Sequence, residues 1–254
     1  MTRILAGNWK MNLGLAEARA LMEAVAAGRG ATPSLRFILF PPFTSLAPLA
    51  ALRKKGDPEL GAQNCHAEPK GAYTGEISAE QVRDAGGSSV LVGHSERRRL
   101  FGENDTLLQA KLRAAWRAGI TPVLCVGETL AERERQETPG VLARQLRRAL
   151  EGAPARADLI VAYEPVWAIG TGVVASPAEV AEAHVWVREE LAAAGPEDAA
   201  SVPVLYGGSV DPKTAGPLSA LPEVDGFLVG GASLTAASFL AIAGALDSRP
   251  HPRS

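Results

Sequence analysis

The chain contains little cysteine. Only Cys65 and Cys125 occur among its 254 residues, and no CxxC spacing is present. Two isolated cysteines argue against a disulfide scaffold and against a cysteine-based zinc cluster, and they are typical of a reducing compartment. We therefore expect a cytoplasmic protein without a metal site.

Long apolar runs and an excess of charge are also missing. No run of about 18 apolar residues occurs, so we expect no membrane span, and the N-terminus MTRILAGNWKMN is too poor in apolar residues for a signal peptide. The formal net charge is -2 without blocks of like charge, so we expect neither nucleic acid nor a membrane as a partner. A preference for an anion must come from a local site.

The sequence does contain a regular series of short apolar runs. They recur roughly 20 to 40 residues apart and are continuous rather than alternating, as in parallel strands buried on both faces. The predicted strands are residues 4–6, 37–40, 60–62, 90–92, 123–126, 159–162, 204–206 and 227–229.

Segments with helical character separate most of these runs. Residues 15–27 are rich in alanine and leucine, and Gly28 after them is predicted to stop a helix. The patterns Ser78-x-x-Gln81 and SPAE at 176–179 predict capping boxes. Eight strands alternating with helices predict an α/β protein, a (β/α)8 barrel.

The barrel is expected to form one domain. About 250 residues is the ordinary size of a (β/α)8 barrel, and no linker divides the chain. We expect a catalytic domain over residues 1–247 and a loose tail over 248–254, which is polar and contains two prolines.

Polar residues follow several of the predicted strands. Asn8 and Lys10 follow the first, Gln63 the third, His94-Ser95-Glu96 the fourth and Glu164 the sixth. Because the carboxyl ends of barrel strands open on one face, we expect these side chains to converge there. Each alone is better explained as a structural or solvated residue. Together they predict proton transfer on an anionic substrate, with an apolar wall making Glu164 a stronger base.

Two glycine pairs follow the last two strands. Gly207-Gly208 precedes Ser209, and Gly230-Gly231 leads toward an apolar helical stretch. Glycine lets backbone N–H groups approach a ligand closely, and a helix N-terminus attracts anions. A tight turn is the simpler explanation of either pair, but two pairs at these strands favour a phosphate site.

The segment of residues 165–172, PVWAIGTG, is apolar where a loop is usually polar. We predict a mobile lid that closes over substrate and excludes water. The alternative is a loop buried under a neighbouring helix.

Six motifs together resemble the triosephosphate isomerase family: AGNWKMN (6–12), GAYTGEIS (71–78), VGHSERR (92–98), AYEPVWAIGTG (162–172), LYGGSV (205–210) and GFLVGGASL (226–234). The resemblance runs from the first strand to the last helix, and VGHSERR and AYEPVWAIGTG are highly specific. It implies a TIM barrel that interconverts dihydroxyacetone phosphate and D-glyceraldehyde 3-phosphate through an enediolate, with no cofactor.

The resemblance also implies a role for each matching residue, as known for this family. Glu164 is the base, His94 a neutral electrophile and Lys10 the positive charge near the substrate. The substrate-binding residues are Asn8, Lys10, Gly170, Ser209, Gly230 and Gly231, and Glu96 and Ser95 are supporting residues.

The stretch GAYTGEIS resembles the family loop that inserts into a second subunit, so the resemblance implies a homodimer through residues 70–78. Two features depart from the family pattern: Lys70, and the proline- and alanine-rich stretch 211–221, which leaves the geometry behind Ser209 open. Cys125 is interpreted as a packing residue.

Two other functions remain open at this point. A different phosphosugar isomerase barrel would account for the glycine pairs but not for His94, Glu164 and the lid in this order. A catalytically silent barrel that binds a phosphosugar would be favoured if Lys10, His94 or Glu164 were replaced, and all three are present.

Overall fold

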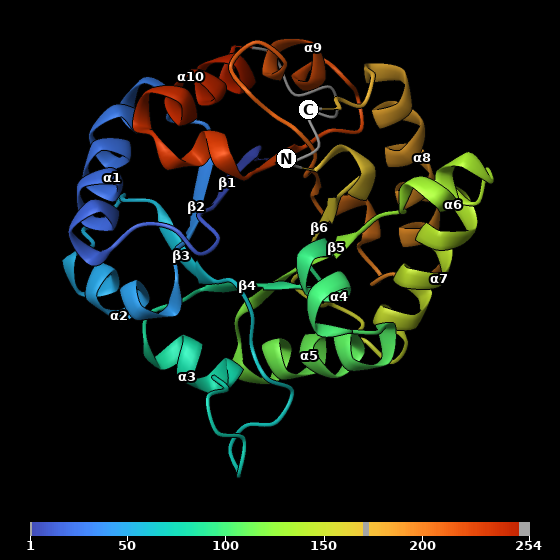
Figure 1. Ribbon diagram of the computed structural model, residues 1–254, viewed down its shortest axis with the longest axis horizontal. Coiled ribbons are helices and arrows are strands. Elements are labelled where there is room, and N and C mark those ends of the chain that lie inside the picture. Colours follow the sequence, from blue (N-terminus) through green and yellow to red (C-terminus); the bar gives the residue numbers. More distant parts are fainter. Residues whose placement is uncertain (1, 170–172, 249–254) are drawn as a thin grey trace.

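The computed structural model describes residues 2–169 and 173–248. Within these ranges, eight parallel strands close into a barrel in the order of the sequence (Figure 1). The predicted (β/α)8 barrel is therefore confirmed. Each predicted strand overlaps an observed one. The strands are β1 (Ile4–Asn8), β2 (Arg36–Phe40), β3 (Glu59–Ala62), β4 (Ser89–Val92), β5 (Thr121–Val126), β6 (Ile160–Tyr163), β7 (Val204–Tyr206) and β8 (Gly226–Val229).

Helices surround the barrel as an outer ring (Figure 1). They are α1 (Leu15–Gly28), α2 (Phe43–Leu52), α3 (Ala79–Asp84), α4 (Ser95–Phe101), α5 (Asp105–Ala118), α6 (Leu130–Glu134), α7 (Thr138–Leu150), α8 (Pro177–Ala194), α9 (Ala215–Ser219) and α10 (Ala236–Asp247). Short 3-10 turns are η1 (Arg29–Ala31), η2 (Val166–Ala168), η3 (Ala199–Ser201) and η4 (Gly231–Leu234). None of the helices in the described ranges is both long and apolar enough to cross a membrane.

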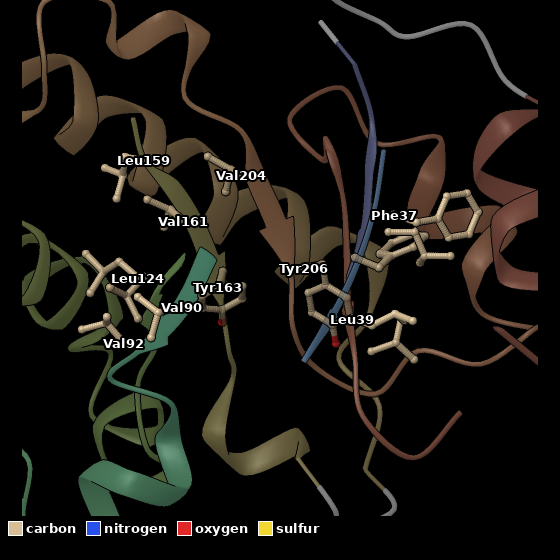
Figure 2. Close-up of a cluster of buried hydrophobic side chains, with 14 of the residues drawn as sticks. Phe37, Leu39, Val90, Val92, Leu124, Leu159, Val161, Tyr163, Val204 and Tyr206 are labelled. Atoms are coloured by element: carbon tan, nitrogen blue, oxygen red, sulfur yellow. The ribbon is translucent and has the colours of Figure 1, made fainter. Parts of the chain in front are cut away.

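The core has two layers because successive strand residues point to opposite faces. On β2, Ile38 and Phe40 belong to the cluster that fills the barrel interior, whereas Phe37 and Leu39 pack between barrel and helices. Figure 2 shows the outer cluster, in which Phe37 and Leu39 lie on one side and Tyr163 on the other. Burial of both faces explains why the strands read as continuous apolar runs.

The barrel closes where the first strand pairs with the last. Ile4 of β1 lies opposite Gly226 of β8, and Asp225 accepts a hydrogen bond from the amide of Ile4 at 3.0 Å. A Cβ at Gly226 would overlap the carbonyl of Ile4, and φ there is +152°, so only glycine fits. The guanidinium of Arg3 donates to the carbonyl of Leu246 at 2.6 Å and ties the last helix to the first strand.

Both predicted capping boxes are present. At α3, the Gln81 amide donates to Ser78 Oγ at 3.2 Å, and at α8 Ser176 and Glu179 make the same reciprocal pair. The helix α1 ends at Gly28 as predicted, but for a different reason. Gly28 has a right-handed φ of -83°, and a Cβ there would overlap the side chain of Leu240 on α10. The glycine is needed for close helix packing rather than for a left-handed cap.

The last helix, α10, ends at Asp247, where the predicted domain also ends. Of the predicted tail, residues 249–254 lie outside the described residues. The stretch 211–221 forms a turn and the short helix α9. Asp211 Oδ1 accepts from the amides of Lys213 and Thr214, each at 2.8 Å, and fixes the chain that follows Ser209.

Candidate active site

A cavity of about 320 Å³ lies at the carboxyl ends of the strands. This volume suits a small ligand. Most of the predicted site residues line it, from five different strand ends: Asn8, Lys10, His94, Glu164, Ser209, Gly230 and Gly231. The structure therefore brings these residues together as the barrel argument predicts. Gly170 lies outside the described residues.

His94 is the N-cap residue of α4 and is buried. Its Nδ1 accepts a hydrogen bond from the backbone amide of Glu96 at 3.2 Å. An N–H donor requires an unprotonated Nδ1, so the hydrogen-bond network assigns a neutral ring with its proton on Nε2. That nitrogen faces the cavity and Glu164, whose Oε1 lies 3.2 Å away. His94 is thus built to donate one hydrogen bond into the site.

Glu164 follows β6 and is only 2 % exposed. Its Oε2 accepts from the amide of Ser95 at 2.9 Å, and Oε1 lies beside His94 Nε2. Ser95, predicted as a supporting residue, therefore holds the carboxylate through its backbone. Both oxygens of Glu164 are engaged by protein donors in this structure.

Two glycines leave room for Glu164. A Cβ at Gly207 would lie 2.9 Å from Cγ of Glu164, and a Cβ at Gly127 would overlap its carbonyl. Neither glycine has a left-handed φ, so space rather than backbone conformation requires them. The first glycine of the 207–208 pair thus shapes the side of the cavity that holds Glu164.

Lys10 stands directly after β1 in an uncommon conformation. Its φ is +51°, a left-handed value that few residues other than glycine adopt. Asn8 Oδ1 accepts from the Lys10 amide at 3.0 Å, and Gln63 Nε2 donates to the Lys10 carbonyl at 2.8 Å. These two side chains hold the strained residue, and such strain is found most often at functional sites.

The ammonium group of Lys10 pairs with Glu96, with Nζ and Oε1 2.7 Å apart. Burial alone would raise the pKa of Glu96, but the hydrogen bond from Lys10 and nearby positive charge bring it below its ordinary value. Glu96 therefore stays ionised at neutral pH, and it orients Lys10 at the rim of the cavity.

Ser209 and the Gly230 pair lie on another wall of the cavity. Ser209 Oγ donates to the carbonyl of Ala168 at 2.7 Å. After Gly230 the chain enters the 3-10 turn η4, and the apolar helix α10 follows from Ala236, so the glycine pair leads toward a helical stretch with one short turn between them. The carbonyl of Gly230 accepts from both the amide and the hydroxyl of Ser233, which closes that turn.

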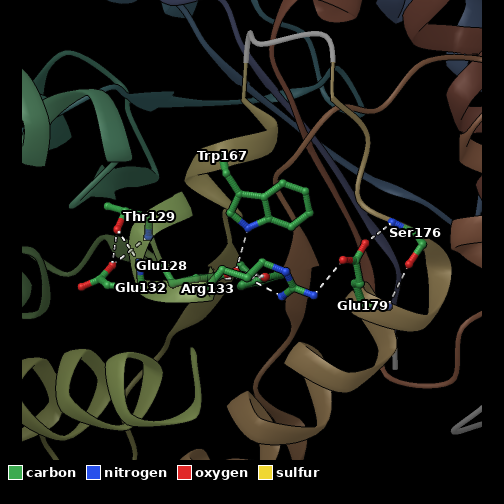
Figure 3. Close-up of polar contacts among 8 residues, drawn as sticks. Glu128, Thr129, Glu132, Arg133, Trp167, Ser176 and Glu179 are labelled. Atoms are coloured by element: carbon green, nitrogen blue, oxygen red, sulfur yellow. Dashed lines mark hydrogen bonds and ion pairs between the residues drawn. The ribbon is translucent and has the colours of Figure 1, made fainter. Parts of the chain in front are cut away.

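The apolar segment 165–172 lies beside this cavity. Ile169 within the segment and Val174 two residues beyond its end both line the cavity wall. Trp167 is half-buried and its Nε1 donates to Glu128 Oε1 at 2.8 Å (Figure 3). Residues 170–172 lie outside the described residues, and the mobility of the lid stays a prediction.

Glu128 was not recognised as a site-supporting residue from the sequence. Its carboxylate is fully buried and also accepts from the hydroxyl of Tyr163 at 3.1 Å. Burial and the negative charge of Glu128 raise the pKa of Tyr163 well above its ordinary value, so the phenol stays a donor. The sequence feature that could have indicated a role for Glu128 is its position two residues after β5, which resembles the position of Glu164 directly after β6.

Cys125 faces the barrel interior and is buried. Burial, together with the neighbouring charge of Glu164, raises the pKa of its thiol well above the ordinary value. A thiol that stays protonated is a poor nucleophile, which agrees with a packing role.

Known proteins of one family match this chain over nearly its whole length. The model of the triosephosphate isomerase family matches residues 3–246. Triosephosphate isomerase from Xanthobacter autotrophicus is 48% identical, over 97% of both chains. The enzyme of that name from Herpetosiphon aurantiacus is 47% identical over 94% of this chain and 97% of its own. The crystal structure of triosephosphate isomerase from Bartonella henselae has a TM-score of 0.88 and 41% identity, covering 96% of this chain and 99% of its own.

Proposed function

The chain belongs to the triosephosphate isomerase family, and from this premise we propose that its cavity interconverts dihydroxyacetone phosphate and D-glyceraldehyde 3-phosphate. The observation that carries the proposal is the pair of buried groups His94 and Glu164, 3.2 Å apart, beside the cation of Lys10. In the proposed reaction, Glu164 accepts a proton, His94 donates a hydrogen bond and Lys10 supplies positive charge.

Glu164 is the base of the proposed reaction. It removes a proton from the carbon beside the substrate carbonyl and returns it to the neighbouring carbon. Its Oε1 lies beside His94 Nε2. In the proposed reaction, the substrate carbonyl accepts the hydrogen bond from His94 Nε2 in place of Glu164 Oε1. The carboxylate of Glu164 is then free to face the substrate carbon. Base catalysis of this kind contributes about 10²–10⁴-fold to the rate.

His94 and Lys10 stabilise the negative charge that develops on the substrate oxygens. The neutral imidazole donates from Nε2, as the contact between Glu96 N–H and Nδ1 requires. Lys10 brings its charge to the same cavity while Asn8 and Gln63 hold its backbone. Donors fixed in a site that excludes water are worth more than in solution, because they need no reorganisation.

The phosphate group of the substrate lies, in this proposal, against Ser209, Gly230, Gly231 and Gly170. Three of them line the far wall of the cavity. A Cβ at Gly230 would stand 3.5 Å from Cε of Lys10, so this wall lies close to the cation. The barrel of residues 1–247 acts as one catalytic domain, and a cytoplasmic location stays a prediction from the cysteine content.

A coupled isomerase assay on the purified chain, with no metal or nucleotide added, tests the function. We expect turnover in both directions, and a loss of several orders of magnitude in kcat for Glu164→Ala with the fold retained by circular dichroism. Equal rates for the variant and its parent would show that Glu164 is not the base. Binding of a triose phosphate without turnover would instead identify a silent barrel.

We also propose that the chain forms a homodimer through the loop of residues 70–78. This loop projects outward between β3 and α3, beyond the ring of helices (Figure 1). Tyr73 in the loop is 45% exposed and stacks on His66, with ring centroids 4.1 Å apart. Met11 and Phe101 are also large apolar residues left exposed. Large apolar side chains left exposed on a surface, together with a projecting loop, fit a second copy of the chain.

Sedimentation velocity tests the dimer. We expect the chain to sediment with twice the mass of one chain at micromolar concentration, and Tyr73→Asp to sediment as a monomer. Leu130→Asp is the matched control, because Leu130 is a similarly exposed apolar residue on α6. A monomeric parent would contradict the proposal.

A further inference from the structure

Arg133 stands outside the cavity, and none of the proposed catalytic steps uses it. It belongs to the short helix α6 and does not line the cavity. Its guanidinium nevertheless contacts three groups that come from three separate parts of the chain (Figure 3). These groups are the indole of Trp167, the carboxylate of Glu128 and the carboxylate of Glu179.

The first contact fixes the beginning of the apolar segment. The Cζ atom of Arg133 lies 5.0 Å from the ring centroid of Trp167, within the range of a cation–π interaction. Glu128 accepts from the same indole at 2.8 Å and lies 3.4 Å from Arg133 Nη1. Arg133 therefore contacts the face of the Trp167 indole and Glu128 its N–H edge, and the two contacts together fix the orientation of the ring.

The second contact fixes the chain at Ser176, four residues beyond the apolar segment. Arg133 Nη2 donates to Glu179 Oε1 at 2.8 Å. The other oxygen of Glu179 accepts from the amide of Ser176, the N-cap residue of α8, at 2.8 Å. Arg133 is thereby linked to the residue at which the chain returns from the cavity to the outer ring of helices.

Charge and burial favour a fixed geometry for this cluster. The guanidinium side chain is only 21% exposed, so water screens its contacts with the two carboxylates incompletely. Burial opposes its charge, but Glu179 and Glu128 raise the pKa of Arg133 above its ordinary value. Lysine lacks the planar guanidinium that stacks on the indole while its separate N–H groups donate to two carboxylates, so it replaces arginine poorly here.

We propose that Arg133 is a positioning residue that fixes Trp167, near the start of the apolar segment, relative to Ser176, at the start of α8. Through Trp167 and Ser176 it determines where Ile169 and Val174 lie on the wall of the cavity. This inference rests on the isomerase function proposed above. No residue of α6 lines the cavity. Through Arg133 this helix nevertheless controls how well the reaction intermediate is shielded from water.

The substitution Arg133→Met tests the inference, because methionine keeps the apolar stem and removes the guanidinium. Arg135→Met is the matched control. Arg135 lies two residues from Arg133, and among the described residues its exposed side chain forms an ion pair with Glu137 alone. Arg133→Lys is the conservative variant. The unmodified chain is assayed alongside, and an inactive parent would refute the function rather than the positioning role.

The first measurement is the yield of inorganic phosphate per isomerisation event. A poorly shielded enediolate loses phosphate: its oxyanion forms a C=O bond, the electron pair of its C=C bond moves to form a C=C bond with the carbon that carries the phosphate, and the C–O bond to phosphate breaks with its electron pair leaving on the phosphate. We expect Arg133→Met to raise this ratio about tenfold and to raise KM more than it lowers kcat, with a smaller effect for Arg133→Lys. Arg135→Met should match the parent.

The second measurement is ¹⁹F NMR of protein labelled with 5-fluorotryptophan, with the Trp167 signal assigned by Trp167→Phe. We expect Arg133→Met to shift or broaden that signal and to leave the other tryptophan signals unchanged. Unchanged phosphate yield, KM and Trp167 signal in a folded Arg133→Met variant would overturn the inference, even if its Tm fell. If that variant does not fold, Glu179→Gln removes one partner of Arg133, and the same measurements decide.

Discussion

The space beside Glu164 makes Gly207 a sensitive position. An alanine Cβ there would lie 2.9 Å from Cγ of Glu164 and 3.3 Å from the carbonyl of Tyr163, whereas ordinary contacts begin near 3.4 Å. The carboxylate side chain must therefore retreat by about half an ångström, because Cγ is too close to the backbone to rotate away freely. Its hydrogen bond with Ser95 and its distance to His94 change as a result.

The effect of Gly207→Ala on rate follows from this displacement. A misplacement of about 1 Å costs about 100-fold in rate, so we expect kcat to fall about tenfold, with a smaller change in KM. Overpacking costs about 1–3 kcal/mol of stability, and the loss of backbone freedom in the unfolded chain returns about 0.4–1 kcal/mol. The free energy of unfolding should therefore fall by only about 1–2 kcal/mol.

The coupled isomerase assay and urea unfolding measure both effects. Gly244→Ala is the control, because Gly244 lies in α10 with nothing within 4 Å of an added Cβ. It should leave kcat unchanged and stabilise the helix by up to about 1 kcal/mol. An unchanged kcat in folded Gly207→Ala would refute the reasoning, since the site would then tolerate a displaced Glu164.

Three further predictions concern stability and reactivity. Burial raises the pKa of Glu59, but the hydrogen bonds and charge of Arg36 outweigh burial and lower this pKa below its ordinary value of 4.5. The ion pair between Glu59 and Arg36 therefore stabilises the fold fully above pH 4.5 and less as the pH falls below it. Glu59→Gln should thus cost about 1 kcal/mol in urea unfolding at pH 7 and less at pH 4; an equal loss at both pH values would contradict this. Cys65, whose pKa burial raises to about 12, and Cys125 are buried, so a disulfide reagent should titrate no thiol in the native protein and two in guanidinium. Ser78→Ala removes the cap of α3 and should lower the free energy of unfolding by about 1 kcal/mol, whereas no change would mean that the cap is unimportant.

Local sequence patterns predicted the elements that depend on neighbouring residues. Burial of both strand faces produces continuous apolar runs, so the eight strands could be located within a few residues. The capping boxes at Ser78 and Ser176 could also be predicted, because both partners lie within one helical turn. The gathering of Lys10, His94 and Glu164 followed from barrel topology alone.

Contacts between distant residues could not be predicted in the same way. The close packing at Gly28 depends on Leu240, and the cluster around Arg133 depends on side chains from three separate segments. The 3-10 turn after Gly230 depends on Ser233 bonding back to one carbonyl, and an apolar helical pattern does not reveal it. Gln63 could be placed at a strand end, but its two backbone acceptors appear only in three dimensions.

The pairing of β1 with β8 has a consequence for synthesis of the chain. While the ribosome is still making the middle of the protein, Ile4 has no partner on one side, because Gly226 does not yet exist. The first strand therefore keeps an open edge until translation is nearly complete. Contacts of such long sequence separation form slowly, so this strand edge stays open to pairing with other molecules until β8 has been made.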